Sequence, residues 1–213
     1  TASHYFGYAM QDQFLPGMYR NQGDGSFKNE AKALGVNLPI MPMGCNFGDI
    51  NNDGWLDFFL GTGNVGLQHV TPNLMFVNRE GKRFENVTLE GGFGHLQKGH
   101  SIGFADFDND GHKDVFSGGR YDGVFVQNIT APGEFTTLEL EESFMFMQAC
   151  NWVDIDNDGM LDAFGCHDDA LSRLWHGNGA GGLTPANELI DLTSYDLTNY
   201  PNTDHSGNYG SVW

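Results

Sequence analysis

The chain has 213 residues, and its 28 Asp and Glu residues against 10 Lys and Arg residues give a formal net charge of −18 at pH 7. This balance leaves too few basic side chains to neutralise a phosphate backbone, which excludes nucleic acid as a partner. The 17 Phe, 7 Tyr and 4 Trp residues supply the buriable surface of a folded protein, and no run of 18 apolar residues predicts a membrane span.

The first predicted element is a hairpin at residues 17–31, "GMYRNQGDGSFKNEA", in which two short strand-like runs flank a glycine-containing turn. Similar units return at residues 74–88, 123–140 and 173–193. Before each of these three later units stands a strand-like run, an acidic stretch and a second strand-like run. One period therefore predicts four short antiparallel strands.

The acidic stretches divide the chain into repeats. They read "DINNDGWLD" from Asp49, "DFDNDGHKD" from Asp106 and "DIDNDGMLD" from Asp154, so they begin 57 and 48 residues apart. Four antiparallel strands at this period are typical of an all-β fold in which each repeat is one blade of a β-propeller. A stacked solenoid is the lesser alternative.

We therefore interpret residues 1–213 as one partial propeller. The expected blades are 41–97, 98–145 and 146–205, with 1–40 as the end of a preceding blade and 206–213 as the first strand of a next one. The final "YGSVW" places Trp213 in the register of Phe47, Phe104 and Trp152, two residues before the position where an acidic stretch begins. The prediction is an incomplete ring, cut inside a blade at both ends.

The acidic stretches follow the pattern Asp-x-Asp/Asn-x-Asp-Gly-x-x-Asp. A loop that curls around a point can direct positions 1, 3, 5 and 9 and the backbone carbonyl of position 7 inward, which suits calcium, a cation that takes six to eight oxygens. Three Ca²⁺ sites are predicted, with these ligands: Asp49, Asn51, Asp53, Trp55 and Asp57; Asp106, Asp108, Asp110, His112 and Asp114; Asp154, Asp156, Asp158, Met160 and Asp162.

The alternatives to calcium are weaker. An EF-hand needs a bidentate Glu at position 12, where this chain has Leu60, Ser117 and Gly165. Magnesium prefers few protein carboxylates and several waters. A plain turn can be built from Asp, Asn and Gly, but a turn has no need of a third or fourth carboxylate, and their mutual repulsion would be costly.

The "YRNQGDGSF" hairpin and the "DxDNDGxxD" loops resemble the FG-GAP/VCBS repeats of integrin α-subunit propellers, in particular the cartilage-acidic-protein-like branch. Phe47-Gly48 matches the name-giving pair, whereas the glycine is replaced by Ala105 and Val153 in the next repeats. The resemblance implies an extracellular β-propeller with calcium between the first two strands of a blade. Such propellers serve adhesion, scaffolding and sugar binding, and also carry enzymes.

The leading functional hypothesis is a non-enzymatic, calcium-stabilised extracellular propeller segment for adhesion, scaffolding or assembly. Its partner would be a protein, a glycan or further copies of itself. One alternative is a lectin-like glycan binder, for which Tyr121 is the clearest exposed aromatic. Another is the propeller of a polysaccharide lyase or a phospholipase-type enzyme.

Three motifs bear on catalysis, and two of them lack the structural context that it requires. "GHSIG" around Ser101 matches a nucleophile elbow but lies in a predicted strand, and "GTGNVG" from Gly61 has no helix after it. His167, Asp168, Asp169 and His176 form the one constellation that suits a transition metal or acid–base chemistry.

Structural roles are predicted for aromatic and cysteine residues. The in-register aromatics are expected in the core: Phe47, Phe58, Phe104, Phe116, Trp152 and Phe164. Cys150 and Cys166 stand symmetrically about Asp158, which predicts that they face each other across a strand pair and leaves a disulfide open. Asn86 and Asn128 match the N-glycosylation tripeptide.

Overall fold

The computed structural model describes residues 15–63, 71–96, 99–118, 124–131, 134–138, 140–167 and 171–190. Within these ranges the regular structure is β, apart from one 3₁₀ turn at Asn187–Leu189. None of the described residues forms a helix long and apolar enough to cross a membrane. The protein is all-β, as the sequence predicted.

Three four-stranded antiparallel sheets and one hairpin make up the described structure, and each sheet is a meander of consecutive strands. The hairpin consists of β1 (Tyr19–Asn21) and β2 (Phe27–Asn29). The first sheet contains β3 (Pro42–Gly48), β4 (Asp57–Thr62), β5 (Leu74–Arg79) and β6 (Arg83–Asn86). The second contains β7 (Ser101–Ala105), β8 (Asp114–Gly118), β9 (Val124–Ala131) and β10 (Glu134–Leu138). The third contains β11 (Met147–Val153), β12 (Asp162–His167), β13 (Arg173–Gly177) and β14 (Leu183–Pro185).

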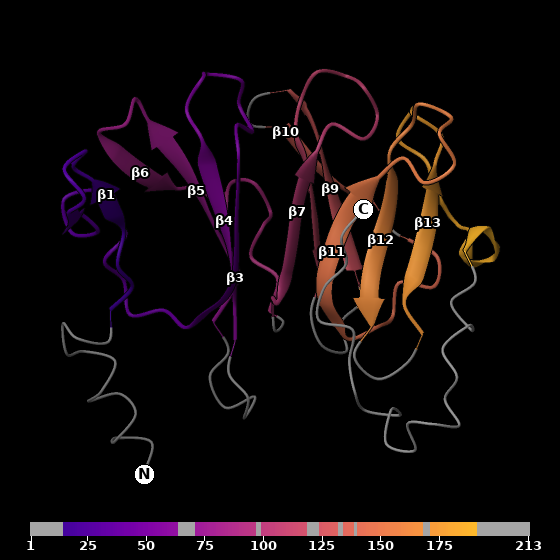
Figure 1. The fold of residues 1–213 in the computed structure, drawn as a ribbon, viewed down its shortest axis with the longest axis horizontal. Helices are drawn as coiled ribbons and strands as arrows, with labels where there is room; N and C mark the ends of the chain where they lie inside the picture. Colours follow the sequence, from indigo (N-terminus) through magenta and orange to yellow (C-terminus); the bar gives the residue numbers. More distant parts are fainter. Residues whose placement is uncertain are drawn as a thin grey trace, which may run out of the picture.

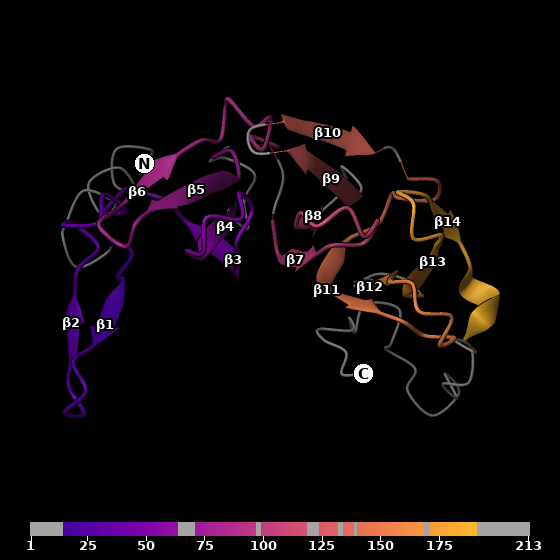
Figure 2. The same ribbon diagram turned by 90° about the horizontal axis from the view of Figure 1, so that it is seen from above.

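The three sheets stand side by side along an open arc, with the first strand of each on the inner side (Figures 1 and 2). β3 lies beside β7, and β7 lies beside β11. A side-chain hydrogen bond joins the first two sheets at this inner side, because Asn46 Nδ2 donates to the backbone oxygen of Ile102 at 2.9 Å. The arrangement is that of an incomplete β-propeller whose ring is not closed.

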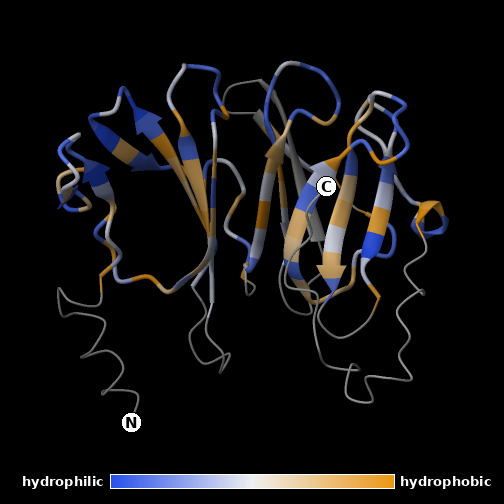
Figure 3. Ribbon diagram, in the orientation of Figure 1, coloured by the Kyte–Doolittle hydropathy of each residue, from blue (hydrophilic) through white to orange (hydrophobic). Residues whose placement is uncertain are grey.

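Hydrophobic residues lie along the strands, while the loops at one edge are hydrophilic (Figure 3). Buried apolar side chains form layers between the sheets. The layer between the first and second sheets includes Phe59, Met75, Ile102 and Val115. The next layer, between the second and third sheets, includes Phe107, Phe116, Met147, Ala163 and Trp175. Each sheet thus buries side chains on both faces, as radial packing of blades requires.

The glycine-rich exit of β4 is explained by close backbone packing. A Cβ at Gly61 would collide with the carbonyl group of Gly99, so only glycine fits there. Gly61 therefore serves contact between the first sheet and the chain that enters the second. This packing accounts for the start of the "GTGNVG" motif without a nucleotide, and residues 64–66 of that motif lie outside the described residues.

One predicted core residue is exposed. Phe104 packs against the layer between the first and second sheets, and Trp152 packs against the next layer. Phe47, at the same repeat position, is 50% exposed, because none of the described residues places a preceding four-stranded sheet against it. Phe58, Phe116 and Phe164 are buried as predicted.

The predicted pairing of Cys150 with Cys166 is wrong. Cys150 lies opposite Gly165, and Ala149 lies opposite Cys166. Adjacent residues of a strand point to opposite faces, so the two thiols lie on different faces of the third sheet. Accordingly, Cys150 packs against the apolar layer that contains Phe116, whereas Cys166 belongs to the one that contains Phe164. All three cysteines are free thiols.

Candidate metal centres

Each four-stranded sheet carries its acidic stretch as the loop between its first two strands, and the three loops lie at the same edge of the arc (Figure 1). The last aspartate of each stretch is the first residue of the following strand, and it pairs with the residue just before the stretch. These pairs are Gly48 with Asp57, Ala105 with Asp114 and Val153 with Asp162. The three copies therefore present equivalent groups along one rim.

Two left-handed residues make each loop turn tightly. The glycine at position 6 has a φ of 87° in Gly54, 90° in Gly111 and 86° in Gly159. The asparagine at position 4 has a φ of 55°, 59° and 60° in Asn52, Asn109 and Asn157. The glycine is part of the sequence pattern given above, whereas a role for the asparagine at position 4 was not predicted, although Asn tolerates this conformation better than most non-glycine residues.

The aspartate at position 1 is fixed by the backbone of its own loop. In the first loop, Asp49 Oδ1 accepts from the N–H of Asp53 at 3.1 Å, and Oδ2 accepts from the N–H of Gly54 at 2.9 Å. Asp106 and Asp154 accept the same pair of bonds in their loops. A carboxylate oxygen has a second lone pair, so these groups are oriented and can still bind a cation.

The aspartate at position 9 is buried and joins the loop to the third strand. Asp57 accepts from the N–H of Ile50 at 2.9 Å and from the N–H of Asn78, on β5, at 2.7 Å. Asp162 likewise accepts from Ile155 and from Gly177, each at 2.9 Å. These bonds give position 9 a structural role in addition to the predicted role as a ligand.

The buried carboxyl of Asp57 lies near the negative charges of Asp53 and Asp49. Burial raises the pKa of Asp57 to about 6, the hydrogen bonds from Asn78 and Ile50 oppose this shift, and the charges of Asp53 and Asp49 add to it. A cation bound between these carboxylates would reverse the repulsion and favour the ionised form. The donor set of the loop, carboxylate and amide oxygens, fits a hard cation such as calcium.

Positions 1, 3 and 9 converge in two of the loops. Oxygens of Asp106, Asp108 and Asp114 lie within 4.8 Å of one another, and so do oxygens of Asp154, Asp156 and Asp162. In the first loop, position 3 is Asn51, whose side-chain amide donates to Asp53 Oδ2 at 3.0 Å. The three loops therefore share a framework and differ in charge, with three aspartates in the first and four in each of the others.

In every loop, the aspartate side chain at position 5 accepts a hydrogen bond from the backbone N–H of position 7. Asp53, Asp110 and Asp158 accept, through Oδ1, the N–H of Trp55 at 2.9 Å, of His112 at 2.8 Å and of Met160 at 2.8 Å. All fifteen residues predicted as ligands therefore lie in the three loops or at their ends. Their assignment as ligands remains a prediction.

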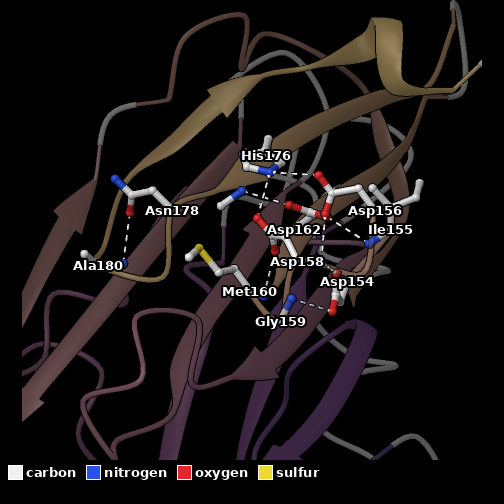
Figure 4. Close-up of polar contacts among 11 residues, drawn as sticks. Asp154, Ile155, Asp156, Asp158, Gly159, Met160, Asp162, His176, Asn178 and Ala180 are labelled. Atoms are coloured by element: carbon white, nitrogen blue, oxygen red, sulfur yellow. Dashed lines mark hydrogen bonds and ion pairs between the residues drawn. The ribbon is translucent and has the colours of Figure 1, made fainter.

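The third loop has an additional neighbour from the sheet. His176, on β13, places Nε2 3.2 Å from Asp156 Oδ2 and 3.3 Å from Asp158 Oδ2 (Figure 4). The predicted constellation of His176 with His167 is not formed, because His167 ends β12 while His176 lies beside the beginning of that strand. Asp168 and Asp169 lie outside the described residues.

The predicted serine and asparagine sites lie in or at the ends of strands. Ser101 is the first residue of β7 and is 3% exposed, so it does not form a nucleophile elbow. Asn86 is exposed at the end of β6, and its side chain accepts from the N–H of Thr88 at 3.0 Å. Asn128 lies within β9, and Tyr121 falls outside the described residues.

Four-stranded antiparallel sheets in an open arc, each with an acidic loop between its first two strands, define a repeat protein of the β-propeller class. Residues 15–60 match the family model of the FG-GAP-like repeat. The chain is 26% identical over 175 residues to cartilage acidic protein 1 of Xenopus tropicalis, an alignment that covers 73% of this chain and 25% of that relative.

These matches support the predicted resemblance to FG-GAP repeat proteins near the cartilage acidic protein branch. It spans about a quarter of the length of the curated relative that it matches.

Proposed function

We propose that the three loops each bind one Ca²⁺ and that the metal stabilises a propeller segment of an extracellular protein. The segment serves adhesion, scaffolding or assembly with protein partners rather than catalysis. The observation that carries the proposal is the set of carboxylates that the backbone orients in the same way in all three loops, one in each sheet, and that converge in the second and third loops. The FG-GAP-like match supports it, because the resemblance noted above links such propellers to calcium between the first two strands.

The proposed ligands are the side chains at positions 1, 3, 5 and 9 and the backbone carbonyl at position 7. Calcium takes six to eight oxygens, so these groups and a water can complete its coordination. Each loop would otherwise hold three or four carboxylates in a short turn. Metal binding at this rim therefore offsets repulsion that the fold itself creates.

Calcium binding should have a measurable effect on stability. Extracellular calcium modules bind at about 10⁻⁴ to 10⁻³ M, and metal at roughly ten times the dissociation constant adds about 1.4 kcal/mol per site. Three sites together add about 4 kcal/mol, a large share of the roughly 5 to 15 kcal/mol that stabilises a domain. For a chain of this size, that corresponds to a rise in Tm of roughly 8 to 16 °C.

The test is thermal melting of the purified 213-residue chain with calcium and with excess chelator, together with calorimetric titration of Ca²⁺. Asp110→Asn removes one carboxylate charge at position 5 of the second loop, and Asp24→Asn is the matched control. Asp24 lies in the β1–β2 turn, outside the acidic loops, where it accepts from the N–H and hydroxyl of Ser26.

The proposal expects about three calcium ions per chain, a Tm that falls on chelation, and weaker binding in Asp110→Asn but not in Asp24→Asn. An unchanged Tm on chelation together with no heat of Ca²⁺ binding would overturn it.

A further inference from the structure

His176 distinguishes the third loop from the other two. Its side chain is 30% exposed, and its Nε2 atom lies close to Oδ2 of both Asp156 and Asp158 (Figure 4). The three residues reach this point from two separate parts of the third sheet, since His176 is on β13 and the aspartates are in the loop before β12. One ligand atom from each lies within 4.8 Å of the other two.

The two carboxylates are held in position by the loop backbone. Asp156 Oδ1 accepts the N–H of Asp158 at 3.2 Å, and Asp158 Oδ1 accepts the N–H of Met160 at 2.8 Å. With both Oδ1 atoms engaged in this way, the Oδ2 atoms are the ones that lie near His176. The site thus combines one imidazole nitrogen and two carboxylate oxygens, and the loop backbone orients both carboxylates.

The distances match the geometry of a small borderline cation. Zinc binds His nitrogen and Asp oxygen at roughly 2.0 to 2.2 Å in a tetrahedral arrangement, for which neighbouring ligand atoms are about 3.3 to 3.6 Å apart. The observed separations from Nε2 are 3.2 and 3.3 Å. Calcium takes oxygen ligands, whereas imidazole suits zinc and other transition metals.

The histidine is not a requirement of the fold. Strand register places His176 just after Trp175, which pairs with Ala163, and places Val77 just after Phe76, which pairs with Phe58. Val77 is therefore the equivalent residue of the first sheet, and it is buried in an apolar layer. The repeat can thus be built with an apolar side chain at this position.

We propose that Asp156, Asp158 and His176 form a second metal position beside the third calcium loop, selective for Zn²⁺ or a similar transition-metal ion. Three protein ligands leave the fourth tetrahedral position to water, and the two aspartates are exposed to solvent. Asp156 and Asp158 are also the proposed calcium ligands at positions 3 and 5 of the third loop, so the two metal positions share both carboxylates, and each carboxylate would bridge the two ions. The zinc position goes beyond the proposed calcium function and does not require it.

The experiment is a Zn²⁺ titration of the untagged chain at pH 7.5 in saturating calcium, followed by a Co²⁺ titration monitored by visible absorption. His176→Val installs the residue that the first sheet has at this position, and Asp24→Asn, in the β1–β2 turn outside the acidic loops, is the control. Melting curves of both variants in calcium verify that each one is folded.

The expected result is one Zn²⁺ equivalent in the parent chain and in Asp24→Asn, with binding weakened at least about 100-fold in folded His176→Val. The intense absorption of four-coordinate Co²⁺ should disappear in His176→Val. Equal Zn²⁺ affinity and stoichiometry in the parent and His176→Val would overturn the inference, as would an equal loss in Asp24→Asn. Calcium titration of the same samples reports separately on the calcium loops, so failure of one proposal is distinguishable from failure of the other.

Discussion

Asn52 in the first acidic loop donates from its side-chain amide to the backbone oxygen of Gly111 in the second, at 2.7 Å, and lies 3.1 Å from His112 Nδ1. The two loops are therefore in direct contact, although they are 59 residues apart in the sequence. This contact joins the acidic loops of the first and second sheets.

Replacement of Asn52 by glycine should loosen this contact without disturbing the turn. Glycine accepts the φ of 55° that Asn52 adopts, so the loss is that of a hydrogen bond, about 0.5 to 1.5 kcal/mol. Asn157→Gly is the matched control, because Asn157 has the same loop position and a φ of 60°. Urea unfolding in calcium should show a larger loss for Asn52→Gly, and equal losses would contradict the assigned role of the amide.

Aspartates at positions 5 and 9 should respond differently to calcium. Asp57→Ala leaves the buried N–H groups of Ile50 and Asn78 without their acceptor, at a cost of about 1 to 3 kcal/mol each. This loss of unfolding free energy should appear both in calcium buffer and in buffer that contains chelator. Asp110→Ala should destabilise the chain mainly in calcium, and the comparison of unfolding free energies in the two buffers is the measurement. A loss confined to calcium in both variants would refute the structural role of position 9.

The metal-free chain should become less stable as the pH rises through about 6. The pKa of Asp57 is raised from 3.8 to about 6 in the folded chain, so between these values the folded state binds more protons than the unfolded state. Stability from this group is therefore greatest at low pH and is lost above pH 6. Urea midpoints at pH 5 and pH 7 in metal-free buffer should differ more for the parent chain than for Asp57→Asn. An identical pH dependence in the two proteins would contradict this assignment.

The cysteines should react with an alkylating reagent in a fixed order. Cys45 is exposed, whereas Cys166 is buried and burial raises the pKa of the Cys150 thiol to about 12. Partial burial also raises the pKa of the Cys45 thiol, so the labelling should be slow and is best followed at pH 8.5. Mass spectrometry of the native chain should find a single adduct on Cys45, and three adducts after unfolding. Fewer than three adducts in the unfolded, non-reduced chain would indicate a disulfide.

The sequence predicted the repeat well because its determinants are local. The acidic stretch, the glycine at position 6 and the alternating apolar residues each act within a few residues, and they identify the strands and loops. The register of the strand pairs was harder to predict from the sequence. Symmetry about Asp158 placed Cys150 opposite Cys166, but the loop closes between Val153 and Asp162, and this shift of one residue reverses the face on which a side chain lies.

Contacts between strands that are distant in sequence could not be predicted either. His176 was grouped with His167 because of their proximity in sequence, yet antiparallel pairing of β12 and β13 brings His176 to the loop and leaves His167 at the far end. The exposure of Phe47 depends on which sheet lies beside it, which its own repeat does not encode. The buried role of Asp57 likewise arises from β5, 21 residues away.

The consecutive pairing of strands determines how the molecule would respond to a pulling force. Among the described strands, each sheet pairs strands that follow one another in the chain, so tension applied at the two ends can unravel one sheet while the next keeps its own strand pairs. The released segments, 42–86, 101–138 and 147–185, each have a fully extended length of roughly 125 to 160 Å at about 3.3 to 3.6 Å per residue. The chain would lengthen by this amount less the distance that the ends of the folded segment already span. Each proposed calcium ion would then link the first two strands of its sheet and raise the force needed to separate them. A stretched chain would show three separate unfolding events, one for each sheet.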